Sequence, residues 1–257
     1  MEPSTEPVVD LDFSLKDRVA VVTGGGSGIG AAIVAAFASK GARVAVVDLD
    51  GAAASKQATA VGGESRGFDC DVADPASVRT TVDAVVEAFG QIDILVNSAG
   101  VVMLGPAEDL PLDAWDKTID INLKGTFLVC QAVGRHMLAA GRGAIVNMAS
   151  QAATVALDQH VAYCASKFGV VGVSKVLAAE WGRRGVRVNT ISPTVVLTDL
   201  GRKAWDGPRG DELKKLIPVG RFAYPDEIAA AAIYLASDAA AMVTGVDLLI
   251  DGGYTIK

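Results

Sequence analysis

Residues 18–41 read RVAVVTGGGSGIGAAIVAAFASKG, and this stretch decides the fold. The β-branched run Arg18–Val22 predicts a strand, and the helical periodicity of Gly28–Lys40 ends at Gly41. Glycines between a strand and a helix allow a tight turn and let a pyrophosphate approach the backbone, where the helix N-terminus supplies free N–H groups and a positive dipole end. The stretch therefore predicts a dinucleotide site. Its expected contacts are Gly24, Ser27, Gly28, Ile29 and Gly30.

Strand-like and helix-like segments alternate outward from this stretch to residue 251. The expected strands are Arg18–Val22, Arg43–Asp48, a weak one ending near Cys70, Ile92–Asn97, Gly143–Met148, Val186–Ile191 and Val246–Ile250. The expected helices are Gly28–Lys40, Ala52–Ala60, Pro75–Phe89, a long one from Leu112 to Ala140, His160–Arg183 and Pro225–Ser237. Asp199–Leu216 is expected to be polar and irregular. The alternation predicts an α/β fold: a Rossmann-type, doubly wound parallel sheet of about seven strands, with helices on both faces.

Length and composition bound the remaining possibilities. A chain of 257 residues, 51% hydrophobic and without a linker or repeat, fits a single domain. We expect a flexible tail over residues 1–12 and one dinucleotide-binding catalytic domain over residues 13–257. The N-terminus has no apolar core of a secretory signal, and no apolar run comes near the ~20 residues that a membrane helix needs.

Charge and cysteine usage exclude several classes of partner. The formal net charge of −7 disfavours nucleic acid and anionic membranes as partners. Three cysteines without a CxxC pair and only two histidines argue against disulfides and against a metal site. A cytoplasmic protein without a metal is expected.

Asp48, at the end of the second predicted strand, indicates which nucleotide binds. A carboxylate about 20 residues beyond the glycine loop hydrogen-bonds the adenosine ribose and repels a 2′-phosphate, which favours NAD over NADP. The alternative is that Asp48 caps the following helix. After the third and fourth strands, further cofactor contacts are expected from small or acidic residues: Asp71, Val72, Asn97, Ala99 and Gly100.

Tyr163 and Lys167 lie four residues apart on a predicted helix, so they share one face. A free phenol has a pKa of about 10, and a nearby ammonium favours the phenolate and lowers that value. Tyr163 is therefore a candidate general base for an alcohol, and Lys167 a candidate ligand of the nicotinamide ribose. The pair also arises by chance in many helices.

Ser150 and Asn122 are candidates with strong structural alternatives. Ser150 follows the fifth strand, where its hydroxyl can orient a substrate oxygen, or can simply cap a turn. Asn122 stands inside the long predicted helix, an unfavourable position for asparagine unless its side chain serves another purpose. We expect it to hold a water against Lys167.

Taken together, these motifs resemble the short-chain dehydrogenase/reductase family in its one-domain form, over nearly the whole chain. The resemblance assigns the Asn-Ser-Tyr-Lys tetrad to Asn122, Ser150, Tyr163 and Lys167, and it adds Pro193, Val196 and Thr198 to the cofactor site. The sequence departs from the family pattern at two positions. It has Asn97-Ser98-Ala99-Gly100 where the family has Asn-Asn-Ala-Gly, and Pro193-Thr194 where the family has Pro-Gly.

The residues near the tetrad are similar to those of the sugar-alcohol branch of that family. This branch includes threitol- and galactitol-type dehydrogenases and L-xylulose reductases. The resemblance implies that Ser150, Gln151, His160, Tyr163 and Trp205 bind substrate. Gln151 can instead be a solvated loop residue, His160 a helix start, and Trp205 a packing residue. L-xylulose reductases generally use NADPH, whereas Asp48 favours NAD.

The resulting expectation is an NAD-dependent homotetramer that reversibly oxidises a secondary hydroxyl of a C4–C6 sugar alcohol, threitol-like, to a ketose. One alternative is a 3-oxoacyl or steroid-type ketone reductase of the same family. Another, of a different class, is a catalytically idle NAD-sensing regulator.

Overall fold

Seven parallel strands form the centre of the computed structural model, which describes residues 11–256. They are β1 Val19–Thr23, β2 Arg43–Asp48, β3 Arg66–Asp69, β4 Ile94–Asn97, β5 Gly143–Met148, β6 Val186–Pro193 and β7 Asp247–Ile250. Their order across the sheet is β3-β2-β1-β4-β5-β6-β7. The strand order reverses between β1 and β4, which pair directly with Thr23 opposite Asn97. The predicted fold class is confirmed.

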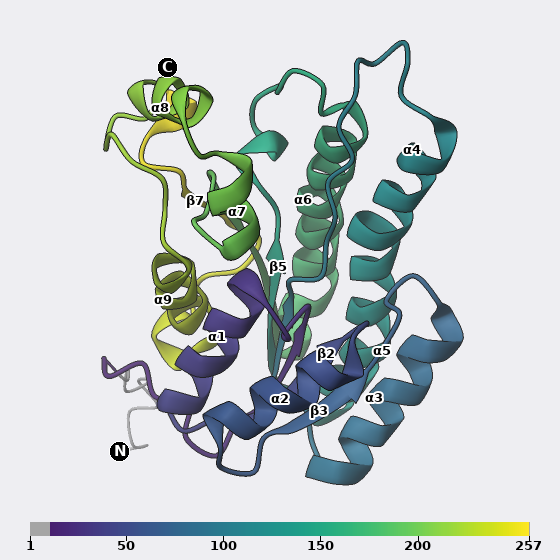
Figure 1. Ribbon diagram of the computed structural model, residues 1–257. Coiled ribbons are helices and arrows are strands. Elements are labelled where there is room, and N and C mark those ends of the chain that lie inside the picture. The colour runs from purple at the N-terminus through teal and green to yellow at the C-terminus, as the bar shows by residue number, and fades with distance from the viewer. Residues whose placement is uncertain (1–10, 257) are drawn as a thin grey trace.

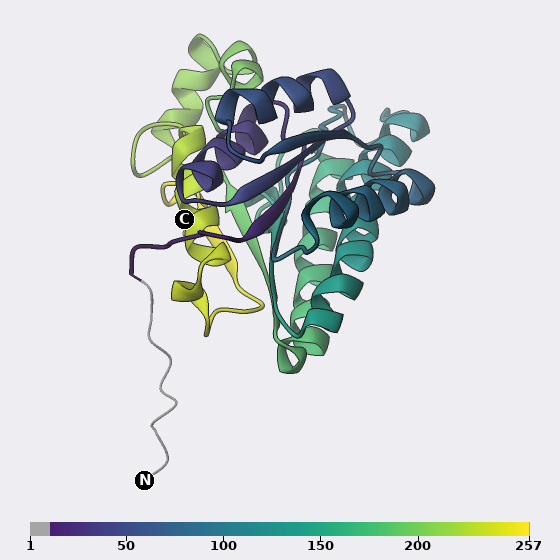
Figure 2. The same cartoon turned by 90° about the horizontal axis from the view of Figure 1, so that it is seen from below.

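Helices cover both faces of this sheet (Figure 1). One face carries α1 Gly28–Ser39, α2 Gly51–Val61 and α9 Pro225–Ala236, and the other carries α3 Pro75–Phe89, α5 Thr126–Ala140 and α6 Val161–Trp181. Ala20 and Val22 of β1 pack with the first group, whereas Val19 and Val21 pack with the second. This alternation follows from the two-residue period of a strand. Figure 2 shows the two helix groups on opposite sides of the sheet.

The predicted helix from Leu112 to Ala140 is not one regular α-helix. It consists of α4 Leu112–Ile119, the π-helical segment η1 Asp120–Gly125, and α5. Asn122 lies in the π-helical segment, where the wider turn displaces the backbone from the α-helical path. The sequence pattern missed this change because all three pieces continue one helical run.

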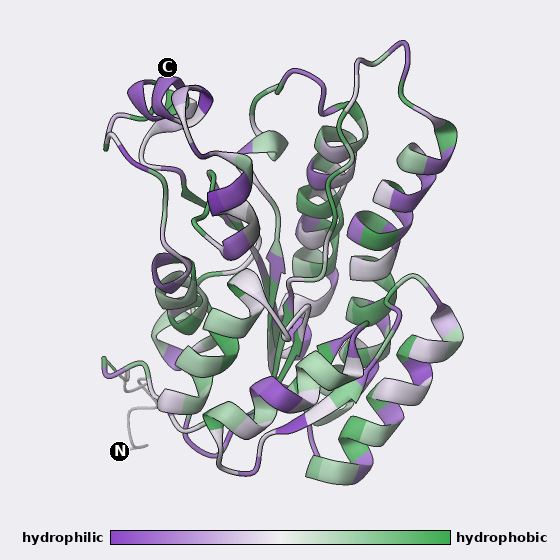
Figure 3. Cartoon of the chain, in the orientation of Figure 1, coloured by the Kyte–Doolittle hydropathy of each residue, from purple (hydrophilic) through white to green (hydrophobic). Residues whose placement is uncertain are grey.

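The prediction that Asp199–Leu216 is irregular is wrong, because two short helices fill it. They are α7 Asp199–Ala204, capped by the Thr198 hydroxyl, and α8 Pro208–Lys215. Five of the eight residues of α8 are charged, so the segment has no apolar stripe to indicate a helix. Figure 3 shows α8, at the upper left, largely in the hydrophilic colour.

One helix is long and apolar enough to cross a membrane by length and composition, contrary to the expectation that no run approaches that length. It spans Val161–Arg184, 24 residues with a mean hydropathy of 1.3. Its inward positions, including Ala162, Val170 and Leu177, are buried against the sheet and its neighbours. Core helices of soluble proteins have the same apolar character.

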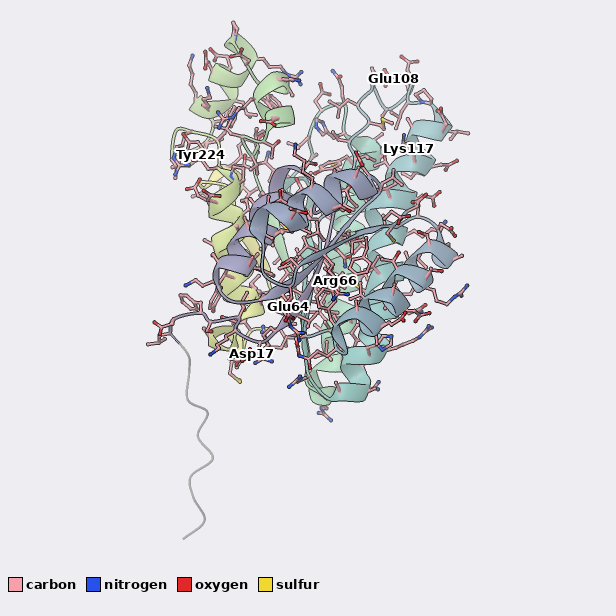
Figure 4. All side chains as sticks on the ribbon, turned by 60° about the horizontal axis from the view of Figure 1, so that its bottom comes forward. Asp17, Glu64, Arg66, Glu108, Lys117 and Tyr224 are labelled. Atoms are coloured by element: carbon pink, nitrogen blue, oxygen red, sulfur yellow. The ribbon has the colours of Figure 1, made fainter. Side chains whose placement is uncertain are left out.

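Contacts also fix the start of the described chain and the β3 edge of the sheet. Leu15 is 1% exposed, which places the packed core close to the predicted boundary at residue 13, whereas residues 1–10 of the predicted tail lie outside the described residues. At the β3 edge, Arg66 stands over the Phe89 ring at 5.7 Å. Figure 4 shows Arg66 and Glu64 on this side of the molecule. Charged side chains at an edge strand oppose pairing with another chain.

A buried chain of hydrogen bonds joins the strands next to the site to helix α6. The Asn97 amide donates to Asn147 Oδ1 at 2.8 Å, and the Asn147 amide donates to Ser174 Oγ at 2.8 Å. Asn147 is completely buried. The chain therefore fixes β4, β5 and α6 relative to one another.

Replacing Asn147 with alanine should lower the free energy of unfolding by roughly 2–4 kcal/mol, because the Asn97 amide loses an acceptor and the Ser174 oxygen loses a donor, both in a buried place. Urea denaturation followed by circular dichroism measures this. Ser174→Ala, which removes one partner only, should cost less than Asn147→Ala. Equal stability of Asn147→Ala and the parent chain would contradict the role of this hydrogen-bond chain.

Candidate active site

A cavity of about 540 Å³ opens at the carboxyl ends of β1, β2, β3 and β4. It lies at the point where the strand order reverses, the position at which doubly wound sheets bind their ligands. Eleven predicted cofactor residues line it: Gly24, Ser27, Gly28, Ile29, Gly30, Asp48, Asp71, Val72, Ala99, Gly100 and Thr198.

The glycine loop leaves no room for side chains where helix α1 meets it. A Cβ on Gly30 would lie 2.1 Å from the Gly24 carbonyl oxygen, and a Cβ on Gly24 would lie 2.8 Å from the Ala99 nitrogen. Gly24 also has a φ of 64°, which glycine adopts at little cost. The backbone of the loop is therefore exposed to the cavity beside the start of α1, a cradle that fits a pyrophosphate.

Asp48 lines this cavity and faces the glycine loop. Its Oδ2 accepts a hydrogen bond from the Gly26 nitrogen at 2.9 Å, and its Oδ1 accepts one from the Asp50 nitrogen at 3.1 Å. The N-cap of α2 is Asp50, whose side chain accepts from Ala52 and Ala53. The alternative that Asp48 caps this helix is therefore wrong. No arginine or lysine lines the cavity among the described residues.

Three residues predicted as cofactor contacts at strand ends do not line this cavity. The Asn97 amide donates to Asn147 and Cys130, so its side chain serves the buried hydrogen-bond chain. Val196 packs into the core under α9, next to an isolated bridge with Ala223, and Pro193 ends β6. The sequence missed Leu49, Cys70 and Ile121, whose apolar character carried no signal for a ligand.

A second cavity, of about 280 Å³, contains the predicted substrate residues. Its lining comes from the loops after β4, β5 and β6, from α6 and α8, and from Trp205 directly after α7. Eight lining residues carry a polar group: Ser150, Gln151, Asp158, His160, Tyr163, Thr194, Trp205 and Arg209. The other four are Val102, Leu157, Val195 and Leu213. The structure thus brings together all five predicted substrate residues.

Tyr163 and Ser150 lie together in this cavity, and a hydrogen bond from the Ser150 side chain acts on the phenol. Burial raises the pKa of Tyr163, and the Ser150 hydrogen bond offsets only part of that rise. The prediction that Lys167 lowers this pKa is therefore wrong for the protein alone. Ser150 also caps the short helix η2 Gln151–Ala153 by accepting from the Ala152 nitrogen, so the alternative of a capping role is correct, and its role toward a substrate oxygen stays a prediction.

Lys167 is buried beside Tyr163 and between the two cavities. Its Nζ lies 5.6 Å from the centroid of the Tyr163 ring and donates to the Met148 carbonyl oxygen at 2.7 Å. It would lie 3.8 Å from a Cβ on Gly100, which lines the larger cavity. Burial lowers the pKa of Lys167 to about 8. The spacing of four residues does place both side chains on one helix face.

Asn122 is fully buried and makes two hydrogen bonds to the loop that follows β4. Its Oδ1 accepts from the Val101 nitrogen and its amide donates to the Val101 oxygen, both at 2.8 Å. The amide also donates to Ser166 Oγ on α6 at 3.1 Å. Its side chain therefore bonds to protein groups, and the water contact with Lys167 stays a prediction. The π-helical turn is what presents Asn122 to Val101.

The remaining substrate candidates have mixed roles. Gln151 is 4% exposed, so the alternative of a solvated loop residue is wrong. His160 is the N-cap of α6, and its Nδ1 contacts the Asp158 carbonyl oxygen. Trp205 packs edge-on against Phe222 at 6.1 Å, and Arg209 covers its ring at 4.8 Å. Arg209, Asp158 and Thr194 were not predicted, because no motif marks them.

The two cavities together provide a long backbone cradle and, beside it, a phenol, a hydroxyl and an ammonium around a small polar space. Within residues 11–256, no group of three or more His, Cys, Asp or Glu side chains is placed to hold a metal ion. All three cysteines are free thiols, and burial raises the pKa of Cys130 to about 12, which makes that thiol unreactive. The arrangement suits proton transfer to or from a small polar molecule next to a bound dinucleotide.

Comparisons with known proteins agree with this arrangement. A family model described as enoyl-(acyl carrier protein) reductase matches residues 24–255. The chain is similar to D-threitol dehydrogenase from Mycolicibacterium smegmatis, at 72% identity over 100% of both chains. It is also similar to an NAD-dependent glycerol dehydrogenase from Listeria innocua, at 51% identity over 96% of this chain and 98% of the relative.

Two solved structures share the fold over nearly their full lengths. One is gox2181, with a TM-score of 0.93 and 41% identity over 95% of this chain and 98% of the other. The other is a gluconate 5-dehydrogenase from Burkholderia cenocepacia in complex with NADP and tartrate, with a TM-score of 0.92 and 36% identity over the same shares.

Gly30→Ala should weaken binding of a nicotinamide dinucleotide by about tenfold or more, because the added Cβ forces the Gly24 carbonyl out of the loop. Fluorescence titration with the reduced dinucleotide measures the dissociation constant. The matched control is Gly182→Ala directly after α6, where the backbone is α-helical and a Cβ meets nothing within 4 Å. That variant should bind the dinucleotide as the parent does. Unchanged binding by Gly30→Ala would remove the glycine loop from the cofactor site.

Proposed function

The chain belongs to the short-chain dehydrogenase/reductase family, and we propose that it oxidises a secondary hydroxyl of a threitol-like polyol of four to six carbons to a ketose, reversibly and with NAD. The observation that carries this proposal is the small polar cavity around Tyr163, next to the dinucleotide cavity.

The size and lining of that cavity favour a polyol over larger or apolar substrates. About 280 Å³ is near the lower end of the ~300–1,000 Å³ of most ligand pockets, a size that suits a small polyol better than a steroid. Eight polar lining residues suit a molecule with a hydroxyl on each carbon. The ketone-reductase alternative needs a longer apolar cavity, and the regulator alternative gives no use to Tyr163 and Lys167. The name of the 72% identical relative also supports a polyol.

In the proposed mechanism, the Ser150 hydroxyl and the Tyr163 phenol hold the reacting oxygen of the alcohol. Tyr163 takes the proton from that oxygen as the carbon is oxidised, and returns it in the reverse direction. When bound, an oxidised nicotinamide dinucleotide supplies the hydride acceptor and adds a positive charge to the site. That charge would favour the phenolate, as the Ser150 hydrogen bond does, against the burial that raises the pKa of Tyr163.

Lys167 and Asn122 are proposed to support this proton transfer without contacting the alcohol. The Lys167 ammonium, held by the Met148 carbonyl oxygen, is placed to bind the ribose and to pass a proton away from Tyr163. Asn122 acts as a positioning residue, because it fixes Val101 between the two cavities and fixes Ser166 one residue before Lys167. Both roles depend on buried hydrogen bonds rather than on contact with the alcohol.

The choice of NAD over NADP rests on Asp48 and on its surroundings. Its carboxylate lines the cavity at the end of β2, and Leu49 follows it. Within residues 11–256, no lysine or arginine lines the cavity with it. A 2′-phosphate there meets a negative charge without a compensating cation. The glycerol dehydrogenase that is 51% identical carries NAD dependence in its name, whereas the gluconate 5-dehydrogenase structure contains NADP.

We further propose a cytoplasmic homotetramer that needs neither metal nor nucleic acid. The apolar side chains left exposed on α5 and α6 support association between copies of this chain: Phe127 is 38% exposed, Phe168 51% and Val176 55%. Light scattering on the purified protein measures the assembly directly. The free thiols of all three cysteines fit a reducing compartment.

The purified protein should form NADH from NAD and at least one alditol in a panel of four to six carbons, and kcat/KM with NADP should be lower by about tenfold or more. Asp48→Ser should reduce the preference for NAD over NADP, because it removes the negative charge that faces the 2′-position of the adenosine ribose. Absorbance at the NADH band provides the assay. Equal use of both dinucleotides by the parent chain would refute the role of Asp48, and no oxidation of any alditol while NAD still binds would refute the polyol substrate.

Alcohol oxidation should speed up with rising pH, about tenfold per unit below the pKa of Tyr163, because only the phenolate accepts the proton. Ketose reduction needs the protonated phenol, so its rate should stay level below that pKa and fall only above it. Initial rates in both directions across a pH series measure this. Tyr163→Phe should lower kcat by about 10²–10⁴-fold and abolish both dependences while NAD binding persists. A Tyr163→Phe variant that keeps the parent pH profile would assign the base to another group.

A further inference from the structure

Arg209 brings a positive charge to the smaller cavity, the one around Tyr163. It lies on α8 and lines this cavity together with Ser150 and Tyr163. Its guanidinium carbon lies 4.8 Å from the centre of the Trp205 ring, which lines the same cavity. In the part of the chain that the structure describes, no hydrogen bond or ion pair involves this guanidinium. Its five N–H donors are therefore available to a ligand.

Aromatic packing holds the guanidinium at the cavity wall. The Trp205 ring packs edge-on against Phe222 at 6.1 Å, and Phe222 is 1% exposed, so the core anchors the ring that Arg209 covers. A guanidinium that stacks on an aromatic face keeps its N–H groups free to form hydrogen bonds in its own plane. The stacking therefore fixes the place of the charge without using its capacity to bind an anion.

The other charged side chain of the lining, Asp158, does not neutralise Arg209. It lies on the loop before α6, and among residues 11–256 no ion pair joins it to Arg209. A neutral polyol also leaves the charge of Arg209 unmatched. A carboxylate, in contrast, supplies a negative charge and two acceptor oxygens at the spacing of the guanidinium fork.

The size of the cavity allows one short chain to reach both Arg209 and the reacting groups. A volume of about 280 Å³ corresponds to a sphere roughly 8 Å across. An extended chain of four to six carbons spans about 4–6 Å between its end carbons, and a hydrogen bond at each end adds about 3 Å. A molecule whose secondary hydroxyl lies at Tyr163 can therefore place its far end at Arg209.

We propose that Arg209 binds the carboxylate of a polyhydroxy acid, so that this chain also oxidises aldonates of four to six carbons. An aldonate has a carboxylate in place of one terminal CH2OH group of an alditol. Its secondary alcohol becomes a ketone: the carbon gives a hydride to NAD, Tyr163 takes the hydroxyl proton, and the carboxylate on Arg209 stays unchanged. The proposal rests on the proposed alcohol oxidation with NAD and extends it from neutral to anionic substrates.

The first test compares kcat/KM, with NAD, for aldonates and for alditols of the same chain length and configuration. At least one aldonate should be oxidised with a kcat/KM within about tenfold of that of its alditol. Raising the ionic strength should raise KM for the aldonate and leave KM for the alditol unchanged, because salt screens the attraction between the carboxylate and the exposed guanidinium.

The second test removes the charge and keeps the packing. Arg209→Met leaves an unbranched stem over Trp205, and it should lower the ratio of aldonate to alditol kcat/KM by about fivefold or more, mainly through KM for the aldonate. Arg209→Lys keeps the charge but not the fork, so its ratio should lie between those of the parent and Arg209→Met. The matched control is Arg202→Met, which removes an exposed charge from α7 outside the cavity lining and should leave the ratio unchanged.

Four outcomes would count against the proposal. An equal loss for aldonate and alditol in Arg209→Met would show that Arg209 only holds Trp205 in place, and would overturn it. An alditol phosphate that is oxidised more efficiently than every aldonate, with the same dependence on Arg209, would overturn the choice of a carboxylate. Oxidation of alditols but of no aldonate would overturn the proposal and leave the proposed function intact. Oxidation of neither, while NAD still binds, would overturn both.

Discussion

Every strand pair in this protein is parallel, and the position of the site depends on that constraint. Parallel pairing places all carboxyl ends on one edge, so residues far apart in sequence meet there without any long loop. Thr23 lies opposite Asn97, and Asn97 opposite Asn147. The glycine loop, the Asn97–Gly100 turn and Ser150 directly extend these three strands. Helix α6 then brings Tyr163 and Lys167 to the same edge.

Buried polar groups divide into two sets around this edge. Asn97, Asn122 and Asn147 make their hydrogen bonds to protein and hold strands, loop and helix in place. Gln151 and Thr194 form the second set, because each has a buried side-chain oxygen without a partner among the described residues, as Asn97 Oδ1 also has. The first set gives the site its geometry, and the second lies beside Tyr163 in the smaller cavity. Lys167 bonds to protein as the first set does, through Met148, and it also adjoins the dinucleotide cavity.

The sequence predicted the features that depend on local pattern. The glycine loop, Asp48 and the four-residue spacing of Tyr163 and Lys167 follow from strand and helix periods and from turn chemistry, and the structure places them as expected. The π-helical turn at Asn122 was missed because widening one turn leaves no mark on residue type. The helices α7 and α8 were missed because charged residues conceal their period.

Other failures of the sequence reading concern long-range burial. The pKa of Tyr163 is raised because the surrounding elements exclude water, and no spacing along the chain contains that information. In the sequence, Thr194 was only a departure from the Pro-Gly pattern of the family. Its place in the lining of the smaller cavity and its unpaired buried oxygen are visible only in the structure. Asn97 was taken for a cofactor contact because its neighbours are, yet its side chain points to Asn147.

The π-helical segment Asp120–Gly125 also has a consequence for how this chain tolerates changes in length. An α-helix turns by about 100° per residue, so one residue more or less rotates everything on one side of the change by that angle. The extra residue of a wide turn absorbs such a phase difference between α4 and α5. Deleting a residue here would close the turn to α-helical geometry and swing Asn122 away from Val101, whereas the same deletion in the loop before α4 would alter only the reach of that loop. The π-helical segment thus sets the rotation of α5 relative to α4. The number of residues between Leu112 and Ala140 is therefore constrained to within one residue, although the residue types at most exposed positions are not constrained.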